Sequence, residues 1–163
     1  MVRLVRASKK KLGEILMEEG LLTQDQVEKI LKEQRETGER FGDLLIDHAI
    51  VDQYDIAKAV VTQFHLPFIH LHNVEVNPNV KGIFTEAILN RNQFVPFDLV
   101  GDILLIAIFG PMDAEILEQL EQASGKQIRV FVSTITEIRK VITEQFTEKS
   151  EVSSLGQMLG IGG

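Results

Sequence analysis

Cysteine is absent from the 163-residue sequence, which excludes disulfide bonds, thiolate metal sites and a cysteine nucleophile. No apolar run approaches the roughly 20 residues that a membrane-spanning helix needs, so we expect no direct membrane span. The N-terminus lacks the hydrophobic region of a signal peptide, and we therefore expect a cytoplasmic protein. The proportions of hydrophobic (44%) and charged (25%) residues are typical of one globular domain or two small ones.

Sequence motifs of catalysis are missing as well. The chain contains no GxxxxGKS/T phosphate loop and no GxSxG, HExxH or CxxC motif. It is therefore not itself a P-loop ATPase; we assign no catalytic residue and expect a protein that is not an enzyme. The formal net charge of −7 argues against binding of a nucleic-acid polymer across the surface.

A 24-residue unit that occurs twice is the most informative feature that is present. The copies run from Lys11 to Gln34 and from Arg40 to Gln63, at an offset of 29 residues. Five of the 24 positions are identical in the two copies, and most others keep their apolar or polar character. Two similar units present two similar surfaces, which suit a ligand that is itself two-fold.

Each copy predicts a short helix, a turn and a longer helix. Gly20 offers a stop for the first short helix, and Thr23 with Gln26 fits a capping box at the start of the next helix. Asp52 holds the equivalent cap position in the second copy. The apolar residues of the longer helices recur at the spacing i, i+3, i+4, which places them on one helix face. They are Val27, Ile30 and Leu31 in the first copy and Ile56, Ala59 and Val60 in the second.

A glutamine closes each apolar stripe, Gln34 in the first copy and Gln63 in the second. A buried carboxamide without hydrogen-bond partners costs roughly 1–3 kcal/mol, so its occurrence at the same place in both copies requires an explanation. Two interpretations stand: the amides contact a ligand, or each one satisfies neighbouring backbone groups or faces solvent at a helix end.

After residue 63 the helical repeat pattern ends, and the sequence predicts an α+β fold for that part. The expected order is an extended segment at 65–71, a helix at 80–90, a hairpin of strands 94–97 and 103–108, a helix from 111 to 123, a strand at 126–132, and a helix to about 146. We expect a small, three-stranded or similar sheet with its helices on one face. The predicted division is a helical subdomain at 1–63, an α+β subdomain at 64–147 and a flexible tail at 148–163.

The residues that open the two copies suggest a nucleotide site. Each copy begins with a cation, an apolar residue and a glycine: Lys11, Leu12 and Gly13, then Arg40, Phe41 and Gly42. Glycine permits close approach of a ligand, a helix start suits phosphate, and arginine recognises guanine. The alternative is a plain helical bundle in which the two glycines allow close packing.

Three histidines, His65, His70 and His72, are close in sequence, and the last two would share one face of a strand. Zinc binding is one interpretation. We favour the other, a run of partly buried strand histidines, and assign no metal ligand.

The tandem unit resembles the motif of the MshEN-type domain, which lies at the N-terminus of type II secretion and type IV pilus assembly ATPases. The family pattern is RLGxxLLxxGLLxxxxLxxxLxxQ, twice, with a five-residue spacer, here 35–39. The later stretches HLPFIHL (65–71), VP (95–96) and LIAIFGPMD (105–113) are similar to the same family, so the resemblance covers about residues 10 to 146.

This resemblance implies binding of cyclic di-GMP by both motifs together, with no other cofactor. By position it implies the following ligand-binding residues: Lys11, Leu12, Gly13, Val27, Leu31, Gln34, Arg40, Phe41, Gly42, Ile56, Val60 and Gln63, with Asp43 and Asp113 at the flanks. The implied partner is a secretion or pilus ATPase, or the inner-membrane platform protein to which such domains dock.

Three residues depart from the family pattern. Lys11 replaces arginine and Phe41 replaces leucine. Ala49 replaces the glycine that the first copy keeps as Gly20, and we expect it to alter the turn. Two functions therefore stand at this point: a cyclic di-GMP receptor within a secretion or pilus motor, and a docking module that binds no nucleotide.

Overall fold

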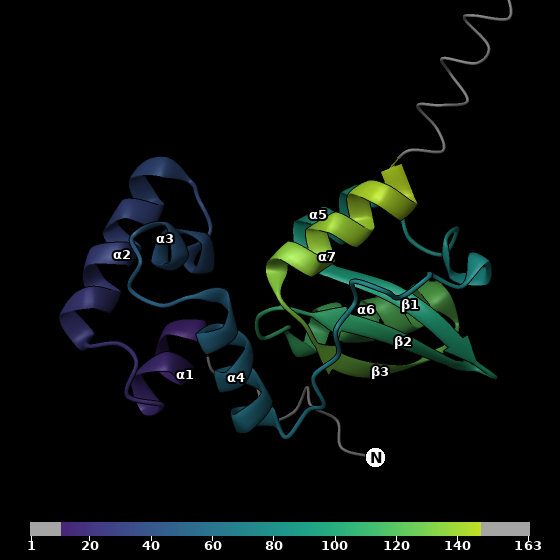
Figure 1. Ribbon diagram of the computed structural model, residues 1–163, viewed down its shortest axis with the longest axis horizontal. Coiled ribbons are helices and arrows are strands. Elements are labelled where there is room, and N and C mark those ends of the chain that lie inside the picture. The colour runs from purple at the N-terminus through teal and green to yellow at the C-terminus, as the bar shows by residue number, and fades with distance from the viewer. Residues whose placement is uncertain (1–10, 148–163) are drawn as a thin grey trace, which may run out of the picture.

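The computed structural model describes residues 11–147, and within them four helices are followed by a sheet with three further helices. The four helices of the repeats gather on one side of the molecule and the sheet lies on the other (Figure 1). This agrees with the predicted α+β class. The predicted flexible tail, 148–163, lies outside the described residues.

Each repeat forms the expected pair of helices. The first copy contains α1 (Leu12–Glu18) and α2 (Gln24–Thr37), and the second contains α3 (Phe41–Asp47) and α4 (Gln53–Phe64). The predicted capping box is confirmed, because the Thr23 hydroxyl accepts from the backbone N–H of Gln26 and the Gln26 side chain accepts from that of Thr23. Asp52 forms a second box with Asp55 at the start of α4.

The repeats exchange partners in space. The short helix α1 packs against α4 of the other copy, and α3 packs against α2. Each copy therefore completes the hydrophobic face of the other, which a single helical hairpin of this size cannot bury alone.

Ala49 does not alter the turn, contrary to our expectation. Its φ of 54° lies in the same left-handed region as the φ of 75° at Gly20, the equivalent residue of the first copy. The two turns also share their backbone hydrogen bonds, since Gly20 N donates to Met17 O as Ala49 N does to Ile46 O. Alanine pays a steric cost in this conformation that glycine avoids.

The sheet contains β1 (Phe94–Val100), β2 (Ile103–Ile108) and β3 (Gln127–Val132), in that spatial order. β1 and β2 form the expected antiparallel hairpin, with Gly101 at a φ of 60° in the turn. β3 runs parallel to β2, which requires the crossover helix between them. An extended segment continues the sheet locally, since Phe68 forms a bridge with Val132 of β3.

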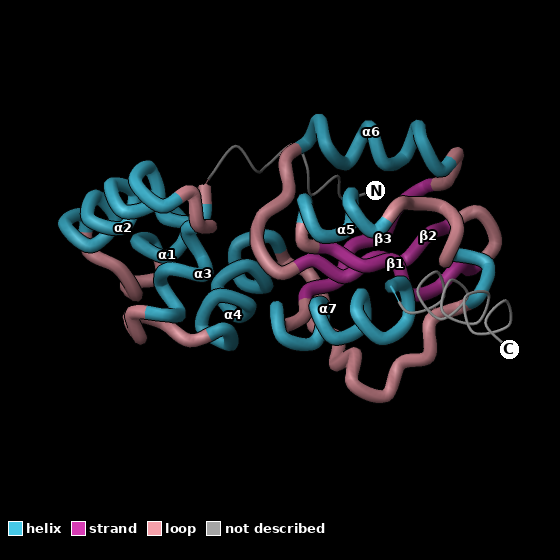
Figure 2. The backbone as a smooth tube through the Cα atoms, turned by 90° about the horizontal axis from the view of Figure 1, so that it is seen from above, coloured by secondary structure: helices cyan, strands magenta, loops and turns pink. Residues whose placement is uncertain are grey.

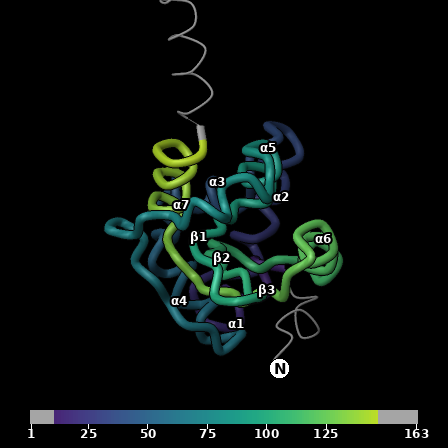
Figure 3. Tube along the Cα trace, turned by 90° about the vertical axis from the view of Figure 1, so that its right-hand side faces the viewer, coloured from purple at the N-terminus to yellow at the C-terminus, as the bar shows by residue number. Residues whose placement is uncertain are grey.

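The remaining helices are α5 (Glu86–Asn92), α6 (Ala114–Ser124) and α7 (Ile135–Ile142), with a 3-10 turn at Pro78–Val80 and a π turn at Thr143–Thr147. α5 begins later than predicted because Thr85 caps it. The expectation of helices on one face was wrong: α6 and α7 lie on opposite sides of the sheet (Figures 2 and 3). Both faces are therefore covered, as the nearly continuous burial along β2 also indicates.

One cluster of buried apolar side chains includes residues of both the repeats and the sheet, from Ile15 of α1 to Ile142 of α7. The domain boundary after residue 63 therefore stays a prediction. Among the helices of residues 11–147, none combines the length and the apolar character that crossing a membrane requires.

Candidate functional site

The opening residues of the two repeats lie against each other. A methyl group added to Gly13 would lie 3.3 Å from Cζ of Phe41, and one added to Gly42 would lie 3.4 Å from Cδ2 of Leu12. The second residue of each motif thus covers the glycine of the other motif. The arrangement is reciprocal, and it joins two segments that are 29 residues apart in the sequence.

Apolar residues of the longer helices complete this cluster. Val27 lies beside Gly13 and Ile56 beside Gly42, so each longer helix supports the glycine of its own copy. Phe109, which follows β2, also lies over Gly42. Sequence reasoning missed Phe109, because it is in neither repeat. In this conformation the two glycines allow close packing of side chains, which is what the helical-bundle interpretation expects of them.

The two copies differ in the exposure of the last apolar position of the stripe on the longer helix. Leu31 of α2 is 37% exposed, whereas its equivalent Val60 in α4 is fully buried. The reason is that α4 also packs against β3, while α2 has no such neighbour among its principal contacts. Of this pair, Leu31 alone is accessible to a ligand without a rearrangement.

The closing glutamines are both half-buried. The amide of Gln63 donates to the carboxylate of Glu19, at the end of α1, with Nε2 2.8 Å from Oε1. Gln63 therefore meets the other repeat, a partner that neither of our interpretations of this residue included. Lys11, which opens the first motif, and the flanking residue Asp113 are exposed at the N-caps of α1 and α6, and neither side chain caps its own helix.

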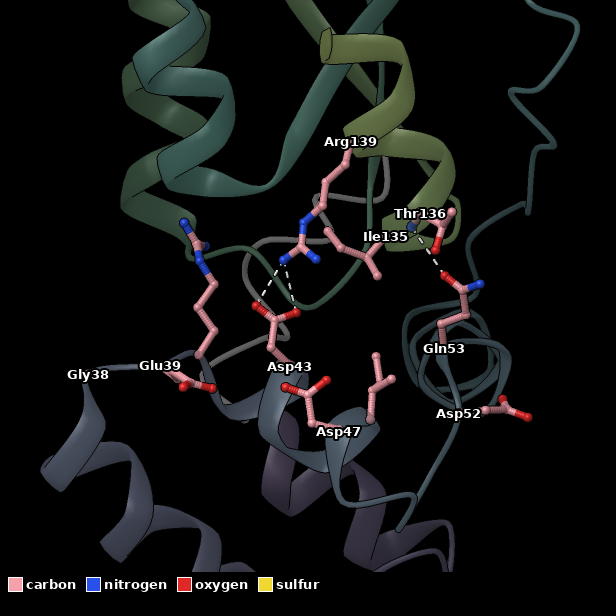
Figure 4. Close-up of a pocket in the computed structure, with 11 residues that line it drawn as sticks. Gly38, Glu39, Asp43, Asp47, Asp52, Gln53, Ile135, Thr136 and Arg139 are labelled. Carbon is pink, nitrogen blue, oxygen red and sulfur yellow. Dashed lines mark hydrogen bonds and ion pairs between the residues drawn. The ribbon is translucent and has the colours of Figure 1, made fainter.

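A cavity of about 680 Å³ lies where α3 and α4 face the first turns of α7 (Figure 4). Arg40 and Asp43, two of the predicted site residues, line it. Arg40 is engaged elsewhere, since its Nη2 donates to the backbone carbonyl of Asn90 in α5 at 2.6 Å. Asp43 is engaged by Arg139 of α7, whose Nη2 lies 2.9 and 2.8 Å from the two carboxylate oxygens.

Arg139 is a candidate that sequence reasoning missed. It is 96 residues from Asp43 and belongs to no motif, so nothing in the sequence placed it at the repeats. The cavity has two guanidinium groups, on Arg40 and Arg139, against four carboxylates from Glu39, Asp43, Asp47 and Asp52. Because the guanidinium groups are held by internal acceptors, an anionic ligand would have to compete for them.

The expected burial of the histidines was wrong. The side chains of His70 and His72 are each 61% exposed, where we expected partial burial. They point outward because the residue between them, Leu71, is buried in the core.

Comparison with known proteins places these features in a family. The model of the MshEN domain matches residues 64–151, more than half of the chain. The chain is 26% identical over 141 residues to the type IV pilus assembly ATPase PilB of Thermus thermophilus, and 25% identical over 139 residues to PilB of Myxococcus xanthus. Each match covers 85% of this chain but only 16% and 25% of the relatives' lengths.

Two solved structures share the fold. A structure of MshE with cdg matches 83% of this chain and 98% of its own, with 26% identity and a TM-score of 0.64. The N-terminal domain of XpsE matches 82% of this chain and 92% of its own, with a TM-score of 0.65 at 18% identity. The predicted resemblance is thereby confirmed: the chain belongs to the MshEN domain family.

Proposed function

We propose that this MshEN domain is a regulatory, non-enzymatic receptor for cyclic di-GMP in a type II secretion or type IV pilus motor. The observation that carries the proposal is the reciprocal packing of Leu12 and Gly13 against Phe41 and Gly42. A two-fold ligand needs two related surfaces side by side, and this cluster brings both motif openings together. The likeness to MshE supports it, since that structure is described as holding cdg, an abbreviation for cyclic di-GMP.

The residues around the cluster have the chemistry that such a ligand requires. Lys11 and Arg40 begin the two motifs and are exposed, so both are able to meet phosphate or guanine. Leu31 offers accessible apolar surface, and the Gln34 amide one turn further along α2 can donate and accept hydrogen bonds. We propose that guanine lies on the apolar surface while the cations meet the phosphates.

Binding would act on the junction between the repeats and the sheet. The Arg40 guanidinium now donates to Asn90 of α5, and a ligand that captures it would release this contact. The repeats and α5 would then be free to change their packing, and a partner that docks across them would respond. Such a ligand shifts the equilibrium by its difference in affinity for the two arrangements.

Isothermal titration of cyclic di-GMP into the domain, with Arg40→Ala and Gln34→Ala, tests the proposal. We expect one ligand unit per pair of motifs and a dissociation constant that rises more than about tenfold for Arg40→Ala, a loss of roughly 1.4 kcal/mol. Arg91→Ala is the matched control. Like Arg40, Arg91 is an exposed arginine, but it lies in the last turn of α5 and outside the repeats. Affinity that is equal in Arg40→Ala and in the control would contradict the assigned site.

A docking module that binds no nucleotide is the second candidate, and Phe41 favours it. Its ring covers Gly13, where the family pattern has the smaller leucine, and thus fills the space by which a ligand would reach the backbone. The partner would be the ATPase that carries the domain or its inner-membrane platform protein. Absence of both heat and thermal stabilisation with cyclic di-GMP, together with nucleotide-independent binding of the platform protein, would establish this function instead.

A further inference from the structure

Two histidines and a glutamate from distant parts of the sequence meet at one surface site. Nδ1 of His70 lies 3.6 Å from Oε1 of Glu137, and Nδ1 of His72 lies 3.7 Å from the same oxygen. The three possible ligand atoms lie within 4.8 Å of one another. Both histidines face one carboxylate oxygen, which distinguishes this cluster from an ordinary ion pair.

The fold fixes the elements that carry these side chains. The extended segment with the histidines is tied to the end of β3, because Ile69 N donates to Val132 O and Val132 N donates to Pro67 O, each at 2.8 Å. Leu71 is 1% exposed and anchors the segment in the core, so residues 70 and 72 project to the same side. The chain leaves β3 directly into α7, and this places Glu137 opposite them.

The glutamate is positioned for a role as a ligand. Its side chain is only 17% exposed, and its Oε2 accepts a hydrogen bond from the hydroxyl of Ser133 at 2.9 Å. Ser133 is itself fully buried, so this bond orients the carboxylate and leaves Oε1 directed at the histidines. Metal-ligating carboxylates are commonly held by hydrogen bonds of this kind.

One histidine has a partner on its other ring nitrogen. Nε2 of His72 lies 2.9 Å from the side-chain amide of Asn73. In this conformation the Asn73 amide nitrogen, Nδ2, faces Nε2 and donates to it. Turning the amide by about 180° would place its oxygen there to accept from Nε2–H, at no cost in geometry. The proposed site requires this second arrangement, because the lone pair of Nδ1 then points toward Glu137 and is available to a metal ion.

We propose that His70, His72 and Glu137 form a site for a divalent transition metal ion, with zinc as the best match. Nitrogen and oxygen ligands about 2.0–2.2 Å from zinc in a tetrahedron lie about 3.3–3.5 Å apart, close to the 3.6 and 3.7 Å between each Nδ1 and Oε1. The whole set lies within 4.8 Å, so the two exposed imidazoles would draw together on binding an ion. Two histidines and one carboxylate leave a fourth position for water or for a side chain of a docking partner.

The metal would clamp the segment that leads out of the repeats to the first turn of α7. Thr136, beside Glu137, donates its backbone N–H to Oε1 of Gln53 in α4, so the same turn contacts the repeats. The site would therefore stiffen the junction between the two parts of the molecule. It involves none of the proposed nucleotide ligands and stands or falls independently of cyclic di-GMP.

Zinc titration of the chelator-treated domain at pH 7.5 tests the site, with calorimetry and the thermal unfolding midpoint as readouts. We expect one zinc per chain and a rise in the midpoint, and an affinity that falls at least about tenfold in His72→Ala and in Glu137→Gln. Substitution with Co²⁺ should give visible d–d absorption that Glu137→Gln diminishes.

His65→Asn is the matched control, because it removes a nearby exposed imidazole while asparagine tolerates the left-handed backbone there, at a φ of 52°. Unfolding midpoints in chelator that agree among the variants establish that loss of affinity reflects the ligands and not misfolding. The proposal is overturned by a titration with neither heat nor thermal shift. It is equally overturned by zinc affinity that Glu137→Gln leaves unchanged or that His65→Asn lowers as much as His72→Ala does.

Discussion

Gln63, the last residue of the second repeat, donates a hydrogen bond to Glu19 of the first, with Nε2 2.8 Å from Oε1. A similar contact joins the copies in the opposite sense, because Nε2 of His48 lies 2.7 Å from Oε2 of Glu33. Glu19 and His48 are equivalent residues, each at the C-cap of a short helix. Each short helix is thus fastened to the end of the longer helix of the other copy, and the repeats are held as an interlocked pair.

Removal of the Gln63 amide should weaken this fastening. We expect Gln63→Ala to lower the free energy of unfolding by about 1 kcal/mol, since a partly buried hydrogen bond to a carboxylate is lost. In a Glu19→Ala background the same change should cost less, and the difference measures the coupling of the two side chains. Urea denaturation of the four proteins gives the cycle, and Gln119→Ala, at an exposed position of α6, is the control. Additive effects would show that the bond contributes nothing to stability.

The contact of Gly13 with Phe41 predicts that a methyl group at this glycine is unfavourable. Gly13→Ala should destabilise the domain by about 1 kcal/mol, because the new methyl group would meet the Phe41 ring at 3.3 Å in a packed cluster. Phe41→Leu shortens that side chain and should recover at least about 0.5 kcal/mol of the loss in the double variant. The measurement is the free energy of unfolding in urea.

Gly82→Ala provides the control for this cycle, since a methyl group added there meets nothing within 4 Å. Its effect should stay within about 0.5 kcal/mol. Equal losses in Gly13→Ala with and without Phe41→Leu would mean that the ring moves aside at no cost. In that case Phe41 would also present no barrier to a ligand.

Local structure was predicted well because its determinants are local. The 3.6-residue spacing of Val27, Ile30 and Leu31 suffices for a helix, and Thr23 with Gln26 suffices for its cap. Gly101 marks the hairpin for the same reason, since its left-handed backbone favours glycine. The helix α5 was placed six residues early, at residue 80; it begins at Glu86, where the Thr85 hydroxyl caps it by accepting from the backbone N–H of Ile88.

Contacts between distant segments were not predictable from one sequence. The family resemblance implied Arg40 in the motif and Asp43 at its flank, but their present partners, Asn90 and Arg139, are 50 and 96 residues away in segments without a motif. Likewise, the histidine pair was visible in the sequence, whereas Glu137 meets it only because β3 leads into α7. A periodic pattern specifies which face of a helix is apolar and leaves open which other element covers it.

The turn at Ala49 yields a prediction of stabilisation. Alanine in the left-handed region costs about 1–2 kcal/mol, and glycine there loses part of that advantage through its greater freedom when unfolded. Ala49→Gly should therefore raise the free energy of unfolding by about 0.5–1 kcal/mol, as measured in urea. Gly20→Ala, the reciprocal change at the equivalent turn, should lower it by a similar amount. Destabilisation by Ala49→Gly would mean that the alanine methyl group makes packing contacts worth more than the backbone strain.

The pairing of Arg139 with Asp43 predicts a larger effect on ligand binding than on stability. The arginine side chain is 51% exposed, and solvent screening limits the pair to less than about 1 kcal/mol, so Arg139→Ala should unfold almost as the original domain does. Its loss would nevertheless leave Arg40 as the cavity's remaining guanidinium among four carboxylates. If cyclic di-GMP binds there, its dissociation constant should rise about fivefold, which corresponds to about 1 kcal/mol.

Lys140→Ala separates this local effect from the change in net charge. Lys140 is adjacent in the sequence and exposed, and it pairs with Glu144 of the π turn that follows α7. Neither residue lines the cavity. Titration of cyclic di-GMP at two salt concentrations should show less than about a twofold change for Lys140→Ala, and that change should vanish at the higher concentration, where distant charges are screened. Equal losses in the two variants would mean that Arg139 acts only through the overall field, and the ligand would then have to be placed elsewhere on the repeats.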